Sequence, residues 1–192
     1  MAADTMTRLT EAARVRLLAD GYARLSTRRV AEEAGVPLSQ IHYHFGGRQG
    51  LLLAVLESEN QRRLDRQRSM YAADVPLSQR YDQACDFLEE DIESGYVRVL
   101  QEMIAAGWSD PAVADKVTEM LGGWFDLLAA VVRDADGELA SLGPVSADEI
   151  AVLAGSAFLG GEALLLLNDE RWAVSVPRSL RRVGDLLRGA ER

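Results

Sequence analysis

The apolar and polar positions from Leu25 to Leu56 predict two short helices joined by a tight turn and followed by a longer helix. The first short helix begins near Arg28, and one of its faces is apolar: Val30, Ala31 and Ala34. Ser26 and Thr27 are predicted to cap its start, because a short side-chain oxygen can accept from the amides of the first turn. A glycine directly after a helix can take the left-handed conformation, so Gly35 is predicted to end this one.

The second short helix is predicted from about Leu38 to Phe45, directly after Pro37, whose fixed φ suits a helix start. Ile41 and Phe45 fall on one face and are expected to be buried. The remaining positions contain no Lys, Asp or Glu and suit a DNA major groove, where polar side chains read base edges. These positions are Leu38, Ser39, Gln40, His42, Tyr43 and His44. The alternative is a tight helical corner within a larger bundle.

The rest of the chain repeats helix signals and lacks the alternating pattern of a β-sheet, which predicts an all-α protein. Four amphipathic segments have recognisable starts: Ser78, Ser109 to Pro111, the capping box Ser146 to Glu149, and Ser175 to Pro177. The predicted breaks between helices are Gly95, Gly107, residues 136–144 and residues 168–174. We expect a helix-turn-helix domain at 1–50 with its motif at about 27–46, a connecting helix at 51–73, and a helical body at 74–192.

The N-terminal third of the chain resembles the DNA-binding domain of the TetR family of transcriptional regulators. Five stretches carry the resemblance: Gly21-Tyr22, Ser26 to Ala31, Ala34 to Val36, Ile41 to Phe45, and Arg48 to Val55. The other two thirds match the family only in helix pattern. The resemblance implies a three-helix helix-turn-helix domain, a C-terminal helical domain for ligand binding and dimerisation, and a dimeric regulator that is not an enzyme.

The resemblance also implies roles for single residues at the DNA. Thr27 would cap its helix and meet a phosphate, and Arg28 would contact a base. The residues expected to face bases are Leu38, Ser39 and Gln40, and those expected to grip phosphates are Tyr43, His44 and Arg48. His42 also belongs to the DNA-binding set, although most relatives carry tyrosine there. Because Pro37 and Gly46-Gly47 depart from the family pattern, no operator sequence is carried over.

Charge is divided along the chain in a way that fits a DNA-reading N-terminus. Residues 1–68 contain eleven arginines and eight acidic residues, a net charge of about +3. The remainder of the chain has a net charge of about −12, and the two sum to −9. Phosphates would therefore be met by the N-terminal domain and not by the acidic body. The acidic run Glu89-Glu90-Asp91 is interpreted as a solvated helix face.

Catalytic, metal and targeting signals are weak. His42 and His44 are the only histidines and point in different directions on a helix, so they do not form a metal pair. Cys85 is the only cysteine and is expected to be a small buried residue, so neither a disulfide nor a thiolate metal site is expected. Without a signal peptide or membrane span, the expected location is cytoplasmic, and no cofactor is expected.

Two segments of the body, 117–132 and 150–167, are apolar on more than one face, which predicts burial on two sides. One side would form a homodimer interface, to which we assign Leu128, Ala157, Gly161 and Leu164. Surplus aromatic and methionine side chains predict an apolar effector pocket. Its candidate residues are Met103, Trp108, Met120, Trp124, Phe125 and Phe158. For each of these residues, ordinary core packing is the alternative.

The sequence thus predicts a dimeric, sequence-specific DNA-binding regulator, a repressor released from a roughly palindromic operator by a small, largely apolar effector. The expected effector is neutral or weakly cationic, because Lys116 is the only basic residue between Val99 and Arg133. Two alternatives stay open: a DNA-binding regulator without an effector, and a helical interaction or catalytic module that does not touch DNA.

Overall fold

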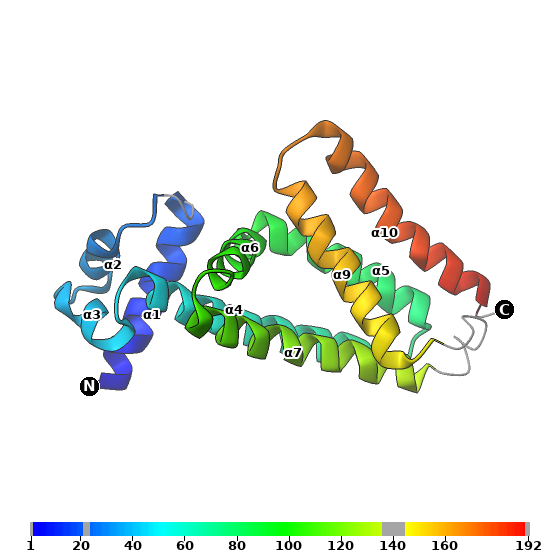
Figure 1. The fold of residues 1–192 in the computed structure, drawn as a ribbon, viewed down its shortest axis with the longest axis horizontal. Helices are drawn as coiled ribbons and strands as arrows, with labels where there is room; N and C mark the ends of the chain where they lie inside the picture. Colours follow the sequence, from blue (N-terminus) through cyan, green and yellow to red (C-terminus); the bar gives the residue numbers. More distant parts are fainter. Residues whose placement is uncertain (1, 21–23, 136–144, 191–192) are drawn as a thin grey trace. The chain divides into compact units, whose positions relative to one another are not determined.

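The structure, a computed structural model, describes residues 2–20, 24–135 and 145–190. The regular structure of these residues is α-helical with no strand, which confirms the predicted all-α class (Figure 1). The helices run as follows: α1 (Ala2–Asp20), α2 (Thr27–Ala34), α3 (Ser39–Phe45), α4 (Arg48–Tyr71), α5 (Leu77–Glu93), α6 (Tyr96–Gly107), α7 (Pro111–Asp134), α9 (Ala147–Leu165) and α10 (Glu170–Ala190). The motif residues Gly21 and Tyr22 and the predicted break at 136–144 lie outside the described residues.

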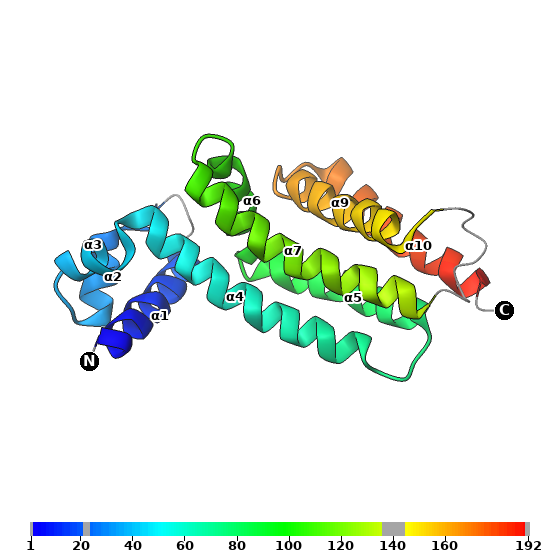
Figure 2. The same ribbon diagram turned by 60° about the horizontal axis from the view of Figure 1, so that its bottom comes forward.

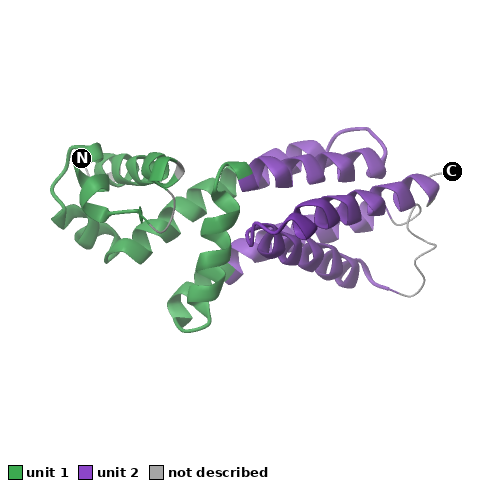
Figure 3. Ribbon diagram, turned by 90° about the horizontal axis from the view of Figure 1, so that it is seen from above, with its two compact units in different colours: residues 1–62, 93–117 green, residues 63–92, 118–192 purple. Residues whose placement is uncertain are grey.

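The chain divides into two compact units (Figure 3). The first contains residues 1–62 and 93–117, and the second contains residues 63–92 and 118–192. The helices α4 and α7 therefore contribute to both units. The segment 51–73, expected to be a connecting helix, lies mostly in α4, which already begins at Arg48.

The first unit holds a small core at its N-terminal end, where α1, α2 and α3 pack against one another (Figure 2). Four side chains with 0% exposure form it, one each from α1, α2, α3 and α4: Leu9, Val30, Ile41 and Leu51. Burying four such side chains contributes on the order of 6–12 kcal/mol before the cost of ordering the chain. These residues follow the predicted apolar faces, so the short helices are held mainly by this core.

In the second unit, α9 and α10 form an antiparallel pair (Figure 1). The start of α9 carries the predicted capping box: Ser146 accepts from the amide of Glu149, whose side chain in turn accepts from the Ser146 amide at 2.8 Å. Two glycines of α9 allow close packing. A Cβ at Gly155 would lie 2.3 Å from the ring of Phe125, and one at Gly161 would lie 2.9 Å from Val176.

A cluster of charged side chains joins α4 to α5 within the second unit. The Nε of Arg63 lies 2.8 Å from Asp91, and Arg66 lies 2.9 Å from the other oxygen of the same carboxylate. Only 13% of the Arg63 side chain and 12% of the Asp91 side chain are exposed. A partly buried carboxylate of this kind requires such partners, and they fix the register between the two helices.

The start of the last helix differs from the sequence prediction. Residues 168–174 were expected to form a break before a helix opened by Ser175 to Pro177, but α10 already begins at Glu170 and includes Pro177 in its interior. That prediction is wrong because Asp169 ends the turn earlier: its carboxylate accepts from the Arg171 amide at 2.9 Å. Pro177 removes only one backbone donor, and the helix continues past it.

No helix among the described residues combines the length and the apolar character needed to cross a bilayer.

Candidate functional site

The turn between α2 and α3 is closed by a left-handed glycine, as predicted. Gly35 has φ 63 and ψ 38. Its amide donates to the Glu32 carbonyl at 3.1 Å, and the Val36 amide donates to the Ala31 carbonyl at 3.0 Å, which together form a Schellman motif. The direction in which the chain leaves α2 is therefore fixed by backbone hydrogen bonds.

Arg8 of α1 adds a clamp to this turn that the sequence analysis missed. Its Nη2 donates to the Ala34 carbonyl and lies 3.4 Å from the Gly35 carbonyl oxygen. A cation at a helix C-terminus also interacts favourably with the helix dipole. The only signal in the sequence was an arginine beside the buried Leu9 on the first helix, which does not specify a partner.

The helix α3 presents the predicted outward residues. Tyr43 is 80% exposed and Leu38 41% exposed, whereas Ile41 is 0% exposed. Ser39 and His42 are exposed, and Gln40 and His44 are half-buried. Phe45, expected to be buried, is also half-buried, and its ring centroid lies 6.2 Å from that of His44. One face of α3 therefore anchors the helix while the other offers aromatic, amide and hydroxyl groups to a ligand.

The start of α2 lies near two exposed cations. Ser26 occupies the N-cap position with extended backbone, but its side chain makes no capping hydrogen bond, and Thr27 is the first helical residue. The Arg28 side chain is 82% exposed and lies 3.2 Å from Glu32, and the Arg29 side chain is 59% exposed. Surface pairs of this kind are weak, so both guanidinium groups can be redirected to phosphates.

The link from α3 to α4 consists of two glycines with positive φ, Gly46 at 70° and Gly47 at 137°. Arg48, expected at a phosphate, turns back into its own domain: its Nε donates to the Leu25 carbonyl at 3.2 Å. This arginine therefore joins the start of α4 to the segment before α2. This contact fixes the side chain near its guanidinium, and the role of Arg48 at a phosphate stays a prediction.

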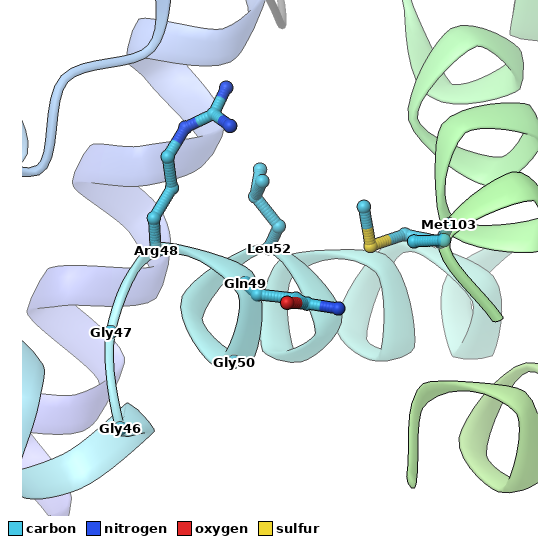
Figure 4. A pocket seen from close by; sticks show the side chains of 8 residues that line it. Gly46, Gly47, Arg48, Gln49, Gly50, Leu52 and Met103 are labelled. Atoms are coloured by element: carbon cyan, nitrogen blue, oxygen red, sulfur yellow. The ribbon is translucent and has the colours of Figure 1, made fainter. Parts of the chain in front are cut away.

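A pocket of about 470 Å³ lies at the start of α4 within the first unit (Figure 4). Its lining residues come from the α3–α4 link, from α4 and from α6: Gly46, Gly47, Arg48, Gln49, Gly50, Leu52, Met103 and Ala106. Met103 was predicted to line an effector pocket, and it does line a pocket, although the partners from α4 were not anticipated. No metal-binding group of three His, Cys, Asp or Glu occurs among the described residues.

The second unit brings together three of the predicted effector residues, Trp124, Phe125 and Phe158. The ring centroids of Trp124 and Phe125 lie 5.4 Å apart, and those of Trp124 and Phe158 lie 6.3 Å apart. Tyr81 of α5, which the sequence analysis missed, lies 6.0 Å from Phe158, and the Trp124 Nε1 donates to Gln67 at 2.7 Å. We call Tyr81, Trp124, Phe125 and Phe158 the aromatic cluster.

The aromatic cluster is partly buried, since each of its four residues is half-buried. Burial raises the pKa of the Tyr81 hydroxyl well above its ordinary value and raises the pKa of Tyr71 to about 12. Burial likewise raises the pKa of the Cys85 thiol to about 11, so this cysteine is inert at neutral pH, in line with its interpretation as a small core residue.

Two other predicted effector residues are not part of the aromatic cluster as defined. Met120, on α7, is buried at 9% exposure. Trp108 is 83% exposed at the end of α6, so it does not line an enclosed pocket in the single chain. The sequence could not separate these cases, since both residues fit the apolar period of a helix.

The predicted dimer residues take different positions. Ala157 is exposed, Leu128 and Leu164 are half-buried, and Gly161 is buried against Val176 of the same chain. Gly161 therefore packs α9 against α10 within the chain, and its place in a dimer interface stays a prediction. Large apolar side chains that the sequence did not assign singly to the interface are exposed on α9, on α10 and between them: Val152, Leu153, Leu167, Val174, Val183 and Leu186.

Comparison with known proteins places this geometry in context. Residues 9–55 match the family model described as bacterial regulatory proteins, tetR family. A search of curated proteins found no match. Hence the family model and the solved structures supply the comparison.

Solved structures share the fold over nearly the whole chain. A TetR transcription regulator from Haloarcula marismortui has a TM-score of 0.73 and 19% identity, covering 96% of this chain and 98% of its own. A transcriptional regulator from Saccharomonospora viridis in complex with choline has a TM-score of 0.73 and 18% identity, with 95% and 94% coverage. The regulator FadR from Bacillus subtilis in complex with stearoyl-CoA has a TM-score of 0.71 and 13% identity, with 94% and 96% coverage.

The clamp from Arg8 leads to a first prediction. Arg8→Ala should weaken the α2–α3 turn by about 1 kcal/mol, because two carbonyl groups lose a charged donor. Hydrogen exchange measured by mass spectrometry should then be roughly fivefold faster in peptides covering residues 27–45. The matched control is Arg14→Ala on the same helix, since Arg14 pairs only locally with Glu11 among the contacts seen. Equal protection in the two variants would contradict the clamp.

Proposed function

We propose that the chain is a transcriptional regulator of the TetR family and that it binds a specific operator through α3. The observation that carries the proposal is that α3 is anchored by the buried Ile41, while Ser39, His42 and Tyr43 are exposed. Regulators of this family bind DNA and are not enzymes, in agreement with the predicted absence of a catalytic site.

In the proposed docking, α3 lies in the major groove. Gln40 and Ser39 read base edges by hydrogen bonding, and Leu38 contacts a thymine methyl group. The residues assigned to the flanking phosphates are Thr27, Tyr43, His44 and Arg48, with Arg28 at a base and His42 at the groove edge. The Nε of Arg48 is held by the Leu25 carbonyl.

Gln40→Ala tests the base-reading assignment. Once the operator has been selected from a random DNA pool, this variant should lose discrimination at one position in each half-site, at a cost of about 1–3 kcal/mol. Arg48→Ala, which removes a phosphate contact, should instead weaken binding to all DNA sequences alike and lower the salt slope by about one unit. Titration by fluorescence anisotropy at several salt concentrations separates the two effects. Unchanged affinity and salt dependence in both variants would exclude the docking.

We propose a homodimer formed by the outer faces of α9 and α10. The support is a set of exposed apolar side chains that a monomer would leave in water, among them Leu153 at 66% and Leu186 at 71% exposure. Exposed small residues of α9, Ala157 and Gly160, permit close approach of a partner helix. A two-fold axis would present two α3 helices to a rough palindrome, with half-site centres about 34–36 Å apart or a multiple of it.

Leu153→Arg tests the dimer without disturbing the core of the chain, because this side chain is 66% exposed. Light scattering should give twice the monomer mass for the wild type and the monomer mass for the variant, with loss of tight operator binding. Gln83→Arg, on the exposed surface of α5, is the matched control and should stay dimeric. A monomeric wild type with full operator affinity would disprove the arrangement.

We propose that a small, largely apolar effector binds at the aromatic cluster and releases a repressor from its operator. Three helices supply the rings, and Gln67 on α4 adds a polar group at Trp124. The cluster carries no charge of its own, which favours a neutral or weakly cationic molecule. Solved structures of the same fold hold choline, a quaternary ammonium cation, and stearoyl-CoA, which joins a long apolar acyl chain to an anionic nucleotide.

A ligand panel with alkyl-chain, aromatic and quaternary ammonium members tests the effector proposal. One class of ligand should raise the melting temperature and lower the affinity for operator DNA. Operator DNA should lower the affinity for that ligand by the same factor. Trp124→Ala should remove the response, whereas Trp108→Ala, a change of the same size at an exposed site, should keep it. A panel that alters neither quantity would favour a regulator without an effector.

A further inference from the structure

The pocket at the start of α4 has the dimensions of a ligand site and is separate from the aromatic cluster. Its volume of about 470 Å³ falls within the ordinary range for small-molecule pockets. All of its lining residues belong to the first unit, whereas the aromatic cluster belongs to the second. A molecule bound here would contact the link that joins α3 to α4.

The lining has an apolar floor and a polar side. Leu52 and Met103, each 1% exposed, supply the floor from α4 and α6. Figure 4 shows the Gln49 side chain extending from α4 toward the side of the pocket formed by Met103. Its amide both donates and accepts hydrogen bonds, so it can pair with an amide or a hydroxyl group of a ligand.

The charged side chains at the pocket, Arg48 and Asp110, already have hydrogen-bond partners in the chain. Arg48 is the only charged residue among the described lining residues. Its side chain takes a different direction from that of Gln49 (Figure 4), and its Nε donates to the Leu25 carbonyl. Asp110 lies 3.5 Å from the Gln49 amide nitrogen, and its other oxygen accepts from the Ala112 amide at 3.0 Å. A charged ligand would lose hydration without gaining a new partner.

We infer that this pocket is a second binding site, for small neutral molecules with an apolar body and one amide or hydroxyl end. A ligand bound in this pocket would change the affinity for DNA, an effect that rests on the proposed function. Gly46 and Gly47 form one wall, and a Cβ on either would meet nothing within 4 Å. A ligand seated between this wall and α6 shifts the attachment of α3 and lowers operator affinity.

Binding is tested with benzamide, benzyl alcohol, benzoate and benzylamine, which share one ring and differ in their polar end. The ε-methyl NMR signal of Met103, assigned with Met103→Leu, should shift saturably with the two neutral probes and not with the two ions. Gln49→Ala should weaken benzamide severalfold. Absence of a shift with the neutral probes, or an equal shift with the ions, would overturn the inference whatever the fate of the DNA proposal.

Coupling to DNA is tested by tethering benzyl methanethiosulfonate to Ala106→Cys, with Ala105→Cys as the control. Ala106 lines the pocket, whereas its neighbour Ala105 is exposed and is not among the lining residues. The buried Cys85, 3% exposed, should stay unlabelled in the native chain.

Labelled Cys variants at the two positions should then differ in operator affinity. Labelling at position 106 should lower affinity about tenfold, a usual size for coupling between sites, and labelling at 105 should leave it unchanged. Gln49→Cys, at an exposed lining residue, repeats the test if the first variant folds poorly. Unlabelled variants that fail to bind any DNA would count against the proposed function, whereas binding that ignores the label would count against the coupling.

Discussion

The left-handed end of α2 at Gly35 is the constraint on which the N-terminal domain depends. It directs the chain so that Ile41 of α3 enters the same core as Leu9 and Val30, each with 0% exposure. Any residue with a Cβ would strain this φ of 63 by about 1–2 kcal/mol. Arg8 supports the turn from α1, so the orientation of α3 is set by backbone geometry and one charged clamp, with its outer face left for recognition.

The link from α3 to α4 is less constrained by its backbone than the turn at Gly35. The link consists of Gly46 and Gly47, with φ of 70° and 137°, and Arg48 faces inward to the Leu25 carbonyl. Two positive-φ glycines restrict the chain less than side-chain-bearing residues would, because glycine has the widest backbone freedom. The backbone alone therefore does not fix how α3 is attached to α4. Side-chain contacts contribute, from Arg48 to the Leu25 carbonyl and from Gln49 to Asp110.

Local signals made the fold predictable from sequence, and long-range contacts limited the rest. Gly35 and the capping box at Ser146 are each specified within a few residues, and both are confirmed. The predicted start of α10 is wrong because the pattern places Pro177 at the opening of the helix. A proline can also remain inside a helix at the loss of one hydrogen bond. Gly161 packs against Val176 of its own chain. The periodicity of apolar residues cannot distinguish such packing within a chain from packing between subunits.

The aromatic cluster sets a condition on any effector that uses it. Its rings touch one another at centroid distances of 5.4 to 6.3 Å, and each such pair stabilises the chain by about 0.5–1.5 kcal/mol. A ligand must therefore replace ring–ring contacts with ring–ligand contacts of at least equal value. Phe125 has little room to move toward α9, because it packs on Gly155. In the proposed effector site, displacement of Trp124 would break a contact with α4, because its Nε1 donates to Gln67 at 2.7 Å.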